Sequence, residues 1–339
     1  MKLYAAIDLH SNNSYLVILS EEGKQLYAKR LPNDLAIILQ ELSPYQNDIE
    51  GIAVESTYNW YWLVDGLMTA GYKAHLVNTV AVQQYSGIKH TDDKSDAQWL
   101  ANLLKLGILP EGYIYPKEQR STRDFFRKRM WLVQKRTMLI LSLQCMVTRG
   151  TSIRLAGSAI QKLTEVDLAR FFINSMDYQS ASVQLSLLHH FTEQINFIEK
   201  ATRQELKKDA NSHLLESIPG VGPILSTTIL LETGPIERFD AVGNYASYCR
   251  CVGSNRVSNG KSNGKNNSKN GNAYLSWAFI EAANNAIRYD TVIKKYYHKK
   301  AAKTHRVVAL KAIAHKLARA TYYMLKEQVP FNRERAFMV

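Results

Sequence analysis

The N-terminal segment reads Leu3-Tyr4-Ala5-Ala6-Ile7-Asp8, an apolar run that ends on one acid. A short run of this composition is typical of a buried β-strand, and the acid then lies at the strand's end. The same pattern returns in Ile52-Ala53-Val54-Glu55. The sequence therefore predicts two buried strands, each with a carboxylate, Asp8 or Glu55, at its tip.

The residues around these two runs have the turns and caps of an α/β domain. Glu22-Gly23 predicts the turn of a hairpin, and the Glu55 strand lies between two predicted helices. Three hairpin-linked strands followed by alternating helices and strands is the order of an RNase H-like fold. The further strands are predicted at residues 15–19, 25–30 and 74–77, and the helices at residues 34–42, capped by Asn33 or Asp34, and 59–70.

Two more acids, Asp93 and Asp96, begin a predicted helix and share one of its faces because they are three residues apart. Together with Asp8 and Glu55 they form the carboxylate set of a two-metal nuclease site. Clustered carboxylates repel one another unless cations neutralise them, and paired Mg²⁺ ions, or Mn²⁺, would do so. Taken singly, each acid could instead be a solvated turn residue or a favourable helix-dipole partner. Asp92 is an alternative to Asp93 as a ligand.

Length and composition limit the class of protein. A chain of 339 residues with 46% hydrophobic content can bury a large core and is expected to form two or three domains. It contains no apolar run of membrane-spanning length and no signal-peptide pattern, so we expect a soluble cytoplasmic protein without a membrane partner. Cys145, Cys249 and Cys251 fit neither a disulfide framework nor a zinc site.

The net charge of +13 is unevenly distributed. Residues 1–115 contain 8 Lys and Arg against 13 Asp and Glu, whereas the remainder contains 35 against 17. Residues 250–319 alone contain 15 Lys and Arg and only two acids, Glu281 and Asp290. This composition favours a nucleic-acid partner over a merely solvated cationic surface.

From Pro116 onward the pattern becomes helical. Residues 120–145 have apolar residues at helical spacing and a basic first half, in which Arg123, Arg127 and Lys128 are candidate nucleic-acid contacts. A second helix after a loop near Asp177 has an apolar seam at three- and four-residue spacing. The pair predicts a coiled-coil arm, either for oligomerisation or for packing within one domain. The seam residues are Leu188, Phe191, Ile195 and Ile198.

Residues 215–225 predict a helix, a Gly-x-Gly turn at Gly220 and Gly222, and a second helix. Such a helix-hairpin-helix turn can present backbone N–H groups to nucleic-acid phosphates. A tight turn between packed helices could use the same glycines for packing alone.

The segment over residues 256–272 is rich in glycine, amide and basic side chains, with an aromatic helix after it. We expect a mobile loop that binds phosphate groups. Its hydroxyl groups on Ser258, Ser262 and Ser268 are possible nucleophiles. The candidate nucleic-acid contacts in the segment are Arg256, Lys261, Lys265 and Lys269.

These features together resemble the DEDD family of bacterial insertion-sequence transposases, the IS110 family, which also includes Piv-like DNA invertases. The resemblance covers essentially the whole chain. It is carried by Ala6-Ile7-Asp8, Val54-Glu55-Ser56-Thr57-Tyr58, the segment from Thr91 to Ala97, Ser217-Ile218-Pro219-Gly220-Val221-Gly222, and the loop from Arg256 to Gly271.

The resemblance implies three domains: a RuvC-like metal-binding domain over residues 1–115, a coiled-coil arm over 116–212, and a helical transposase domain over 213–339. It implies metal ligation by Asp8, Glu55, Asp93 and Asp96. The catalytic serine falls on Ser258, which would join covalently to DNA.

By the same resemblance, the partners are donor and target DNA and an element-encoded bridge or seek RNA. The protein would act as a dimer or tetramer near the nucleoid of a bacterium. Three alternatives remain at this point: a junction-resolving endonuclease in which water attacks, a DNA invertase without guide RNA, and a non-enzymatic DNA-binding protein whose acids only cap helices.

Overall fold

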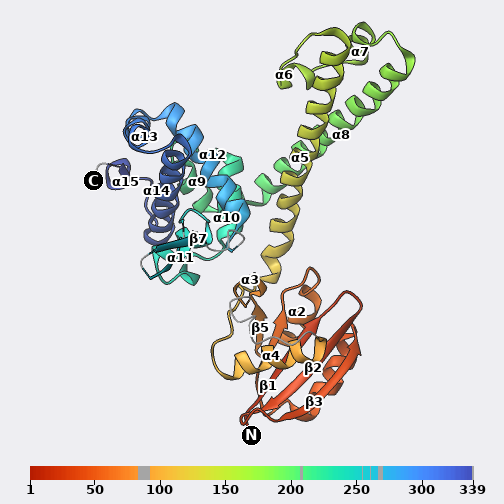
Figure 1. The fold of residues 1–339 in the computed structure, drawn as a ribbon, viewed down its shortest axis with the longest axis vertical. Coiled ribbons are helices and arrows are strands. Elements are labelled where there is room, and N and C mark those ends of the chain that lie inside the picture. The colour runs from red at the N-terminus through yellow and green to blue at the C-terminus, as the bar shows by residue number, and fades with distance from the viewer. Residues whose placement is uncertain (83–91, 207–208, 254, 260, 266–269, 338–339) are drawn as a thin grey trace. The chain divides into compact units, whose positions relative to one another are not determined.

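A computed structural model describes residues 1–82, 92–206, 209–253, 255–259, 261–265 and 270–337. The chain forms two compact units, Met1–Lys117 and Glu118–Val339, which are considered separately (Figure 1). Among the described residues, no helix is both long and apolar enough to cross a membrane. The expected three-domain division remains a prediction.

The first unit is built on a mixed sheet of five strands in the order β3-β2-β1-β4-β5. β1 pairs antiparallel with β2 and parallel with β4, and β4 pairs parallel with β5. This order is compatible with the predicted RNase H-like domain. The strands are β1 (Leu3–Leu9), β2 (Asn13–Ser20), β3 (Gln25–Pro32), β4 (Ile49–Glu55) and β5 (Ala74–Val77).

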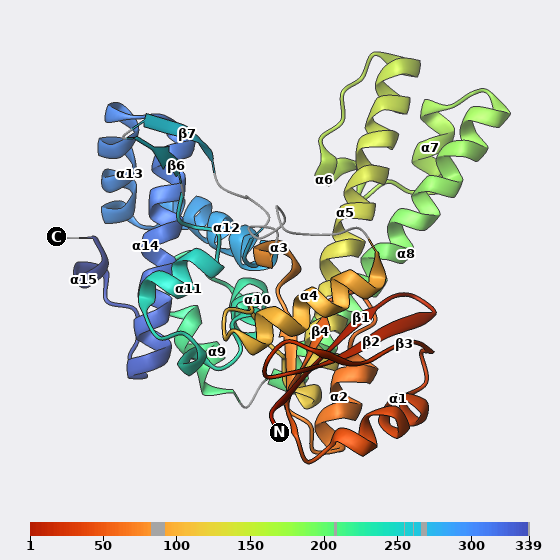
Figure 2. The same ribbon diagram turned by 60° about the horizontal axis from the view of Figure 1, so that its bottom comes forward.

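Helices cover both faces of this sheet (Figure 2). Side chains alternate between faces along a strand, so β1 contributes Ile7 to one core and Ala6 to the other. The Ile7 side packs against α1 (Leu35–Leu42) and α2 (Tyr61–Thr69), while the Ala6 side packs against α4 (Asp93–Lys105). Smaller elements of the unit are η1 (Ser43–Tyr45) and α3 (Thr79–Val82).

All the strands and helices predicted for residues 1–82 are present, with ends that differ by at most three residues. Asp34, rather than Asn33, caps α1, because its carboxylate accepts hydrogen bonds from the N–H groups of Ala36 and Ile37. These predictions succeeded because strand alternation and helix caps are local signals.

The second unit begins with two long helices, α5 (Lys117–Thr151) and α8 (Ser175–Leu206). The second helix was predicted to follow a loop near Asp177, and α8 begins at Ser175, so that Asp177 lies in its first turn. Leu188 of the predicted seam packs with Leu143 of α5, and Ile198 packs with Phe126. The seam therefore buries side chains within one chain. Two short helices that were not predicted join the pair, α6 (Gly157–Ile160) and α7 (Glu165–Phe171).

The rest of the second unit is a helical bundle around one apolar core that includes the side chains of Tyr245, Phe279 and Leu317. Cys249 and Cys251 are buried in it, and no disulfide is formed by the chain's three cysteines. The elements are α9 (Ala210–Glu216), α10 (Pro223–Thr233), η3 (Ile236–Arg238), α11 (Val242–Tyr248), α12 (Ala273–Tyr289), α13 (Thr291–Lys303), α14 (Arg306–Glu327) and α15 (Arg333–Phe337).

The segment predicted as a mobile loop contains two strands, β6 (Asn255–Ser258) and β7 (Lys261–Lys265), which pair antiparallel. The sequence analysis predicted a loop here and did not predict this hairpin. The missed signal is Asn259-Gly260, because Asn-Gly between two pairing segments favours a tight hairpin turn. Asn259 has a φ of 49°, a left-handed conformation that such turns require.

Candidate functional site

Asp8 and Glu55 are brought together by the parallel pairing of β1 with β4. Ile7 lies opposite Val54 in this register, so the next residue of each strand, Asp8 or Glu55, occupies the same edge of the sheet. Asp8 follows Ala6 by two residues and Glu55 follows Ala53 by two, so both acids point to the face that α4 covers. Asp8 is 2% exposed.

Asp93 and Asp96 lie in the first turn of α4. Asp96 is followed by Ala97 and Leu100, which are buried against the same face of the sheet. The acids therefore extend the buried stripe of the helix toward the ends of β1 and β4. Asp92, the alternative to Asp93, caps α4 and accepts a hydrogen bond of 2.6 Å from the Ser95 N–H.

The pKa of Asp8 shows how close the four acids are. Burial, a hydrogen bond with Glu55, and the charges of Glu55, Asp96 and Asp93 raise the pKa of Asp8 to about 8. An acid with this pKa holds its proton at neutral pH unless a cation takes the proton's place. All four predicted acids thus belong to one electrostatic cluster.

Two basic side chains also lie in the cluster: His10, which the sequence indicated only as a possible phosphate contact, and Arg30, which was not predicted. The His10 Nε2 atom lies 3.3 Å from Asp8 Oδ2 and 3.3 Å from Asp93 Oδ1. Arg30, near the end of β3, donates to Asp93 Oδ2 at 2.6 Å. No local signal marks Arg30, because it reaches Asp93 only through the order of strands in the sheet. His10 follows Asp8 by two residues, so its place beside the site could be read from the sequence.

The backbone of His10 is fixed by two amide side chains. Asn33 and Asn59 donate hydrogen bonds to the His10 carbonyl oxygen at 3.0 and 3.1 Å. Asn33 follows β3 and Asn59 follows β4, so the segments after three strands are tied together at the edge where the acids lie. This connection holds the His10 imidazole next to Asp8.

The donor set suits a hard divalent cation. One ligand atom from each of Asp8, His10 and Asp93 can be chosen so that all lie within 4.8 Å of one another. Glu55 and Asp96 add carboxylates to the same cluster. Carboxylate oxygens are the ligands that Mg²⁺ and Mn²⁺ prefer. A cation at this place would relieve the repulsion that, together with burial and the hydrogen bond with Glu55, raises the pKa of Asp8.

In the second unit, the predicted contact Arg127 already has a partner. Its guanidinium donates to both carboxylate oxygens of Glu232, at 2.6 and 2.7 Å, and lies 4.6 Å from the Tyr274 ring centre. Glu232 also accepts a hydrogen bond from Asn272 Nδ2 at 2.7 Å. The sequence missed this buried network because Arg127 and Glu232 are far apart in the chain.

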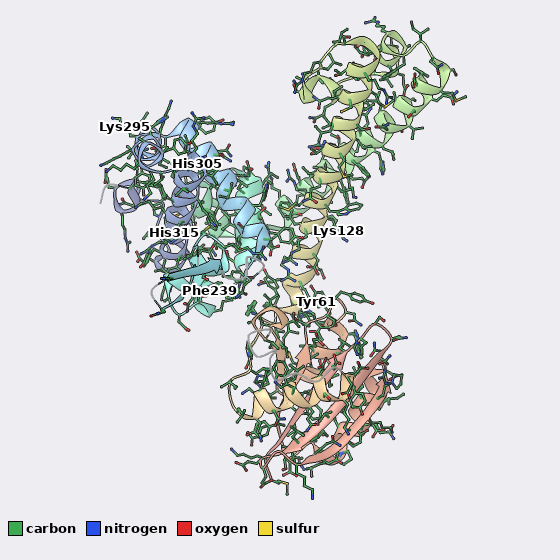
Figure 3. The ribbon with its side chains drawn as sticks, in the orientation of Figure 1. Tyr61, Lys128, Phe239, Lys295, His305 and His315 are labelled. Carbon is green, nitrogen blue, oxygen red and sulfur yellow. The ribbon has the colours of Figure 1, made fainter. Side chains whose placement is uncertain are left out.

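The neighbours of Arg127 differ in exposure. Arg123 is buried and contacts Asp124 at 3.3 Å. Lys128 is exposed, and Figure 3 labels it on α5. Of the three predicted contacts on this helix, Lys128 is the one whose charge faces solvent in the isolated chain.

The helix-hairpin-helix turn joins α9 to α10 as predicted. Gly220 has a φ of +88°, and a Cβ there would lie 2.5 Å from the backbone nitrogen of Ala286, so this glycine is required for packing. Gly222 caps α10 and has open space around its Cα. The turn lines a polar hollow of about 410 Å³. Packing explains Gly220, and the N-terminus of α10 at Gly222 leaves room for an anion.

The predicted nucleophile Ser258 ends β6 and pairs with Lys261 in the hairpin. The structure describes the backbone, but not the side chains, of Ser258, Arg256, Ser262 and Lys265, and Lys269 and Ser268 lie outside the described residues. Lys261 is exposed.

The segment that carries the hairpin is anchored where it joins α12. The Arg250 guanidinium donates two hydrogen bonds to the Gly271 carbonyl oxygen, at 3.1 and 2.8 Å. Gly271 has a φ of +87°, and a Cβ there would lie 2.6 Å from the Tyr248 carbonyl oxygen. Asn272 caps α12 and binds Glu232. The hairpin therefore leaves and re-enters a fixed part of the bundle.

Two family models match parts of the chain that include the site residues described above. Residues 5–150 match a family model of DEDD transposases of the IS110 type, described as "Transposase". Residues 212–298 match the family described as "Transposase IS116/IS110/IS902 family". The two matches together cover more than two thirds of the 339 residues. The chain belongs to the IS110 family of DEDD transposases.

A relative among curated proteins is the uncharacterized 44.8 kDa protein of insertion element IS116 from Streptomyces clavuligerus. It is 25% identical over 108 residues, which are 32% of this chain and 27% of that protein. In this match the chain spans about a quarter of the relative's length. The similarity supports the family and leaves the activity to be argued from the site.

Proposed function

We propose that this protein is a DNA recombinase that excises and inserts an insertion sequence by phosphoryl transfer. The observation that supports it most is the cluster of Asp8 with Glu55, Asp93 and Asp96, in which burial, the hydrogen bond with Glu55 and the charges of the three other acids raise the pKa of Asp8 to about 8. Such an arrangement destabilises the domain unless a cation binds, so we take it as a metal site. The family, whose two models are both described as transposase, supports DNA as the substrate.

Asp8, Glu55, Asp93 and Asp96 would hold Mg²⁺ or Mn²⁺. Bound divalent cations would polarise the scissile phosphate and neutralise charge on the leaving oxygen. Two further side chains of the site would position a metal ligand and contact the substrate. Arg30 would hold Asp93 in place through its 2.6 Å hydrogen bond, and His10, beside Asp8, could contact a phosphate oxygen or exchange a proton.

Ser258 is the proposed nucleophile. Its hydroxyl oxygen would attack phosphorus in line, forming a phosphoserine ester as the bond to the DNA oxygen breaks, and that oxygen would leave with a proton. A position at the tip of a short hairpin supports this role, because a projecting turn can enter a site that a helix surface cannot reach. The anchoring bonds of Arg250 and Asn272 would hold the hairpin's ends.

The basic second unit would bind the nucleic acid. Lys128, Lys261 and the hollow at Gly222 are available for phosphate contacts, and the exposed lysines of α13 add to the positive charge. We further propose that an element-encoded guide RNA pairs with donor and target DNA, and that at least a dimer, built through the long helices, brings a serine of one subunit to the acids of another.

A junction-resolving nuclease is the second candidate. It would use the same acids with water as the nucleophile, and Ser258 would be idle. The acidic cluster supports both reactions equally, and only a covalent protein–DNA product distinguishes them.

The test is DNA attachment by the full-length protein on the DNA of its own element, with Mg²⁺ present. Ser258→Ala should abolish the covalent adduct while nucleic-acid binding persists, because one hydroxyl adds little to an interface with so many cations. Ser262→Ala is the matched control and should keep the adduct. Strand cleavage by Ser258→Ala at the wild-type rate would establish the nuclease instead. Sequencing RNA that copurifies with the protein tests guidance, which requires one defined RNA rather than a heterogeneous mixture.

A further inference from the structure

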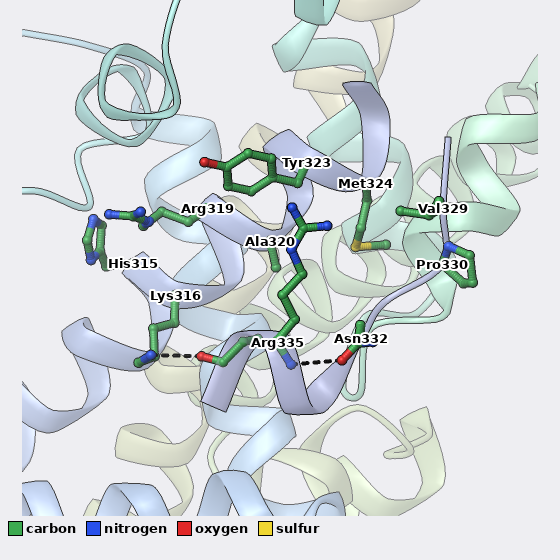
Figure 4. Close-up of a pocket in the computed structure, with 11 residues that line it drawn as sticks. His315, Lys316, Arg319, Ala320, Tyr323, Met324, Val329, Pro330, Asn332 and Arg335 are labelled. Carbon is green, nitrogen blue, oxygen red and sulfur yellow. Dashed lines mark hydrogen bonds between the residues drawn. The ribbon is translucent and has the colours of Figure 1, made fainter. Parts of the chain in front are cut away.

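A cavity of about 510 Å³ lies between α14 and the C-terminal segment that carries α15 (Figure 4). The surface of α14 lines it with two rows of side chains at helical spacing. Ala320 lies in the middle, and because its side chain is a single methyl group, the helix surface is hollow there. The rows are His315, Arg319 and Tyr323, and Lys316, Ala320 and Met324.

The opposite wall is held in place by hydrogen bonds. The chain leaves α14 at Gln328, which has the left-handed φ of 53°. The Phe331 N–H then donates to Ser217 Oγ at 3.0 Å, and Lys316 Nζ donates to the Ala336 carbonyl oxygen at 2.7 Å. Since both ends of the wall are tied to helices of the bundle, the cavity is preformed.

The cavity is positively charged and has no acid among its lining residues. Arg335 is neutralised by Glu327, with hydrogen bonds of 2.6 and 3.0 Å. Arg319 is exposed, and within the described part of the chain its guanidinium has no hydrogen bond or ion pair. Burial and then the charges of Arg319 and Lys316 lower the pKa of His315. Arg319 and Lys316 therefore provide positive charge that no lining side chain neutralises.

The same cavity has a flat, apolar side. The Arg335 guanidinium lies 4.9 Å from the centre of the Tyr323 ring, so two planar groups are stacked at the rim. Met324 and Val329 add apolar surface. A ligand that matches both sides has a planar ring system and an anionic group, and the volume is in the range that binds small organic molecules.

We propose that this cavity binds one unpaired nucleotide of a nucleic-acid strand. The base would lie against Tyr323 and Met324, and its phosphate would contact Arg319 and Lys316. A base inside a duplex cannot enter a concave site, so the ligand must come from a single-stranded region or an extruded base. The inference rests on the proposal that this unit binds nucleic acid, and it adds a binding site for a single nucleotide.

The experiment compares three variants of the full-length protein in binding a fluorescent single-stranded oligonucleotide. Arg319→Gln should weaken binding about tenfold and lower the salt dependence by about one charge. Ala320→Leu should weaken it by a similar factor, because it fills the cavity without changing the charge. Arg306→Gln removes an exposed cation of the same helix outside the cavity, and should weaken binding no more than about twofold.

A direct readout locates the bound strand. Ultraviolet crosslinking of an oligonucleotide that contains a photoreactive uracil should label the peptide with Tyr323 in wild type, and Ala320→Leu should remove that label. Equal effects of Arg319→Gln and Arg306→Gln, or unchanged binding by Ala320→Leu, would overturn the proposal. Crosslinking only to peptides that do not contain Tyr323 would also overturn it.

Competition separates the two sources of a nucleotide. A mononucleotide such as AMP at millimolar concentration should compete weakly with the oligonucleotide if the cavity reads one unit of a strand. Tight AMP binding that the oligonucleotide does not displace would assign the cavity to a free nucleotide and overturn the proposal. Because the assays measure binding, they are independent of Ser258, and loss of the recombinase hypothesis would leave their result interpretable.

Discussion

Two carboxylates of this chain, Asp8 in the first unit and Glu232 in the second, are almost equally buried, at 2% and 4% exposure. Their surroundings are opposite. Glu232 is paired with the Arg127 guanidinium through two short hydrogen bonds and receives a third from Asn272. Asp8 shares a hydrogen bond with Glu55 and is repelled by three other carboxylates.

The difference separates a structural acid from a functional one. A buried carboxylate that pairs with a cationic side chain of the same protein is already neutralised, so it requires no bound cation. Such a pair also connects the two helices or strands that carry its members. A buried carboxylate among other acids leaves a charge that only a proton or an external cation can balance. Arg30 balances part of that charge in the first unit through its ion pair with Asp93, but the raised pKa of Asp8 shows that a deficit remains.

The largest effect on stability should come from breaking the neutralised pair. Arg127→Ala leaves Glu232 buried without its cation, which costs about 3 to 5 kcal/mol. Urea unfolding followed by circular dichroism measures the loss. Lys128→Ala, the exposed neighbour, is the control and should change the free energy of unfolding by less than about 0.5 kcal/mol. A similarly small change in Arg127→Ala would mean that Glu232 is not held by this pair.

The same contrast explains what could be predicted from sequence. Asp8 and Glu55 end apolar runs, and Asp93 and Asp96 share a helical spacing, so each acid has a local signal and the topology of alternating elements brings them together. Arg127 was predicted to contact nucleic acid because its neighbours are basic. Its partner Glu232 is 105 residues away, and no local pattern reveals a long-range pair. Arg30 was missed for the same reason.

The hairpin shows a different limit. Glycine, amide and lysine residues predict an irregular loop by composition, yet the turn signal Asn259-Gly260 fits the pairing of β6 with β7. Composition averages over a segment, whereas a hairpin is determined by two residues at its turn. The helix-hairpin-helix turn was predicted because its glycines are local, but the packing of Gly220 against α12 is a tertiary contact.

A second prediction concerns the contribution of the acidic cluster to the free energy of unfolding of the metal-free protein. The pKa of Asp8 is about 8 in the folded protein and near 3.8 in the unfolded chain. Between these values the folded state binds a proton that the unfolded state has lost, so stability falls as pH rises from about 4 to about 8. Asp8→Asn removes this titration and should stabilise the metal-free protein at pH 8 by about 1 to 3 kcal/mol.

Unfolding in the presence of a chelator, at pH 5 and at pH 8, measures this effect. Glu21→Gln changes an exposed acid in the turn after β2 and serves as the control, with the same small effect at both pH values. If Asp8→Asn were as stable as wild type at pH 8 and showed the same pH dependence, Asp8 would not carry the unbalanced charge.

The smallest expected effect is the stabilisation by Mg²⁺, to which the acidic cluster around Asp8 should respond and the Arg127–Glu232 pair should not. A cation that binds the folded state at ten times its dissociation constant adds about 1.4 kcal/mol. Because binding displaces the proton of Asp8, the apparent affinity should rise from pH 6 to pH 8. Thermal unfolding with and without Mg²⁺ measures the shift. Asp8→Asn should lose most of it, whereas Glu232→Gln, although less stable, should keep it. An equal Mg²⁺ response in both variants would place the bound cation outside the acidic cluster.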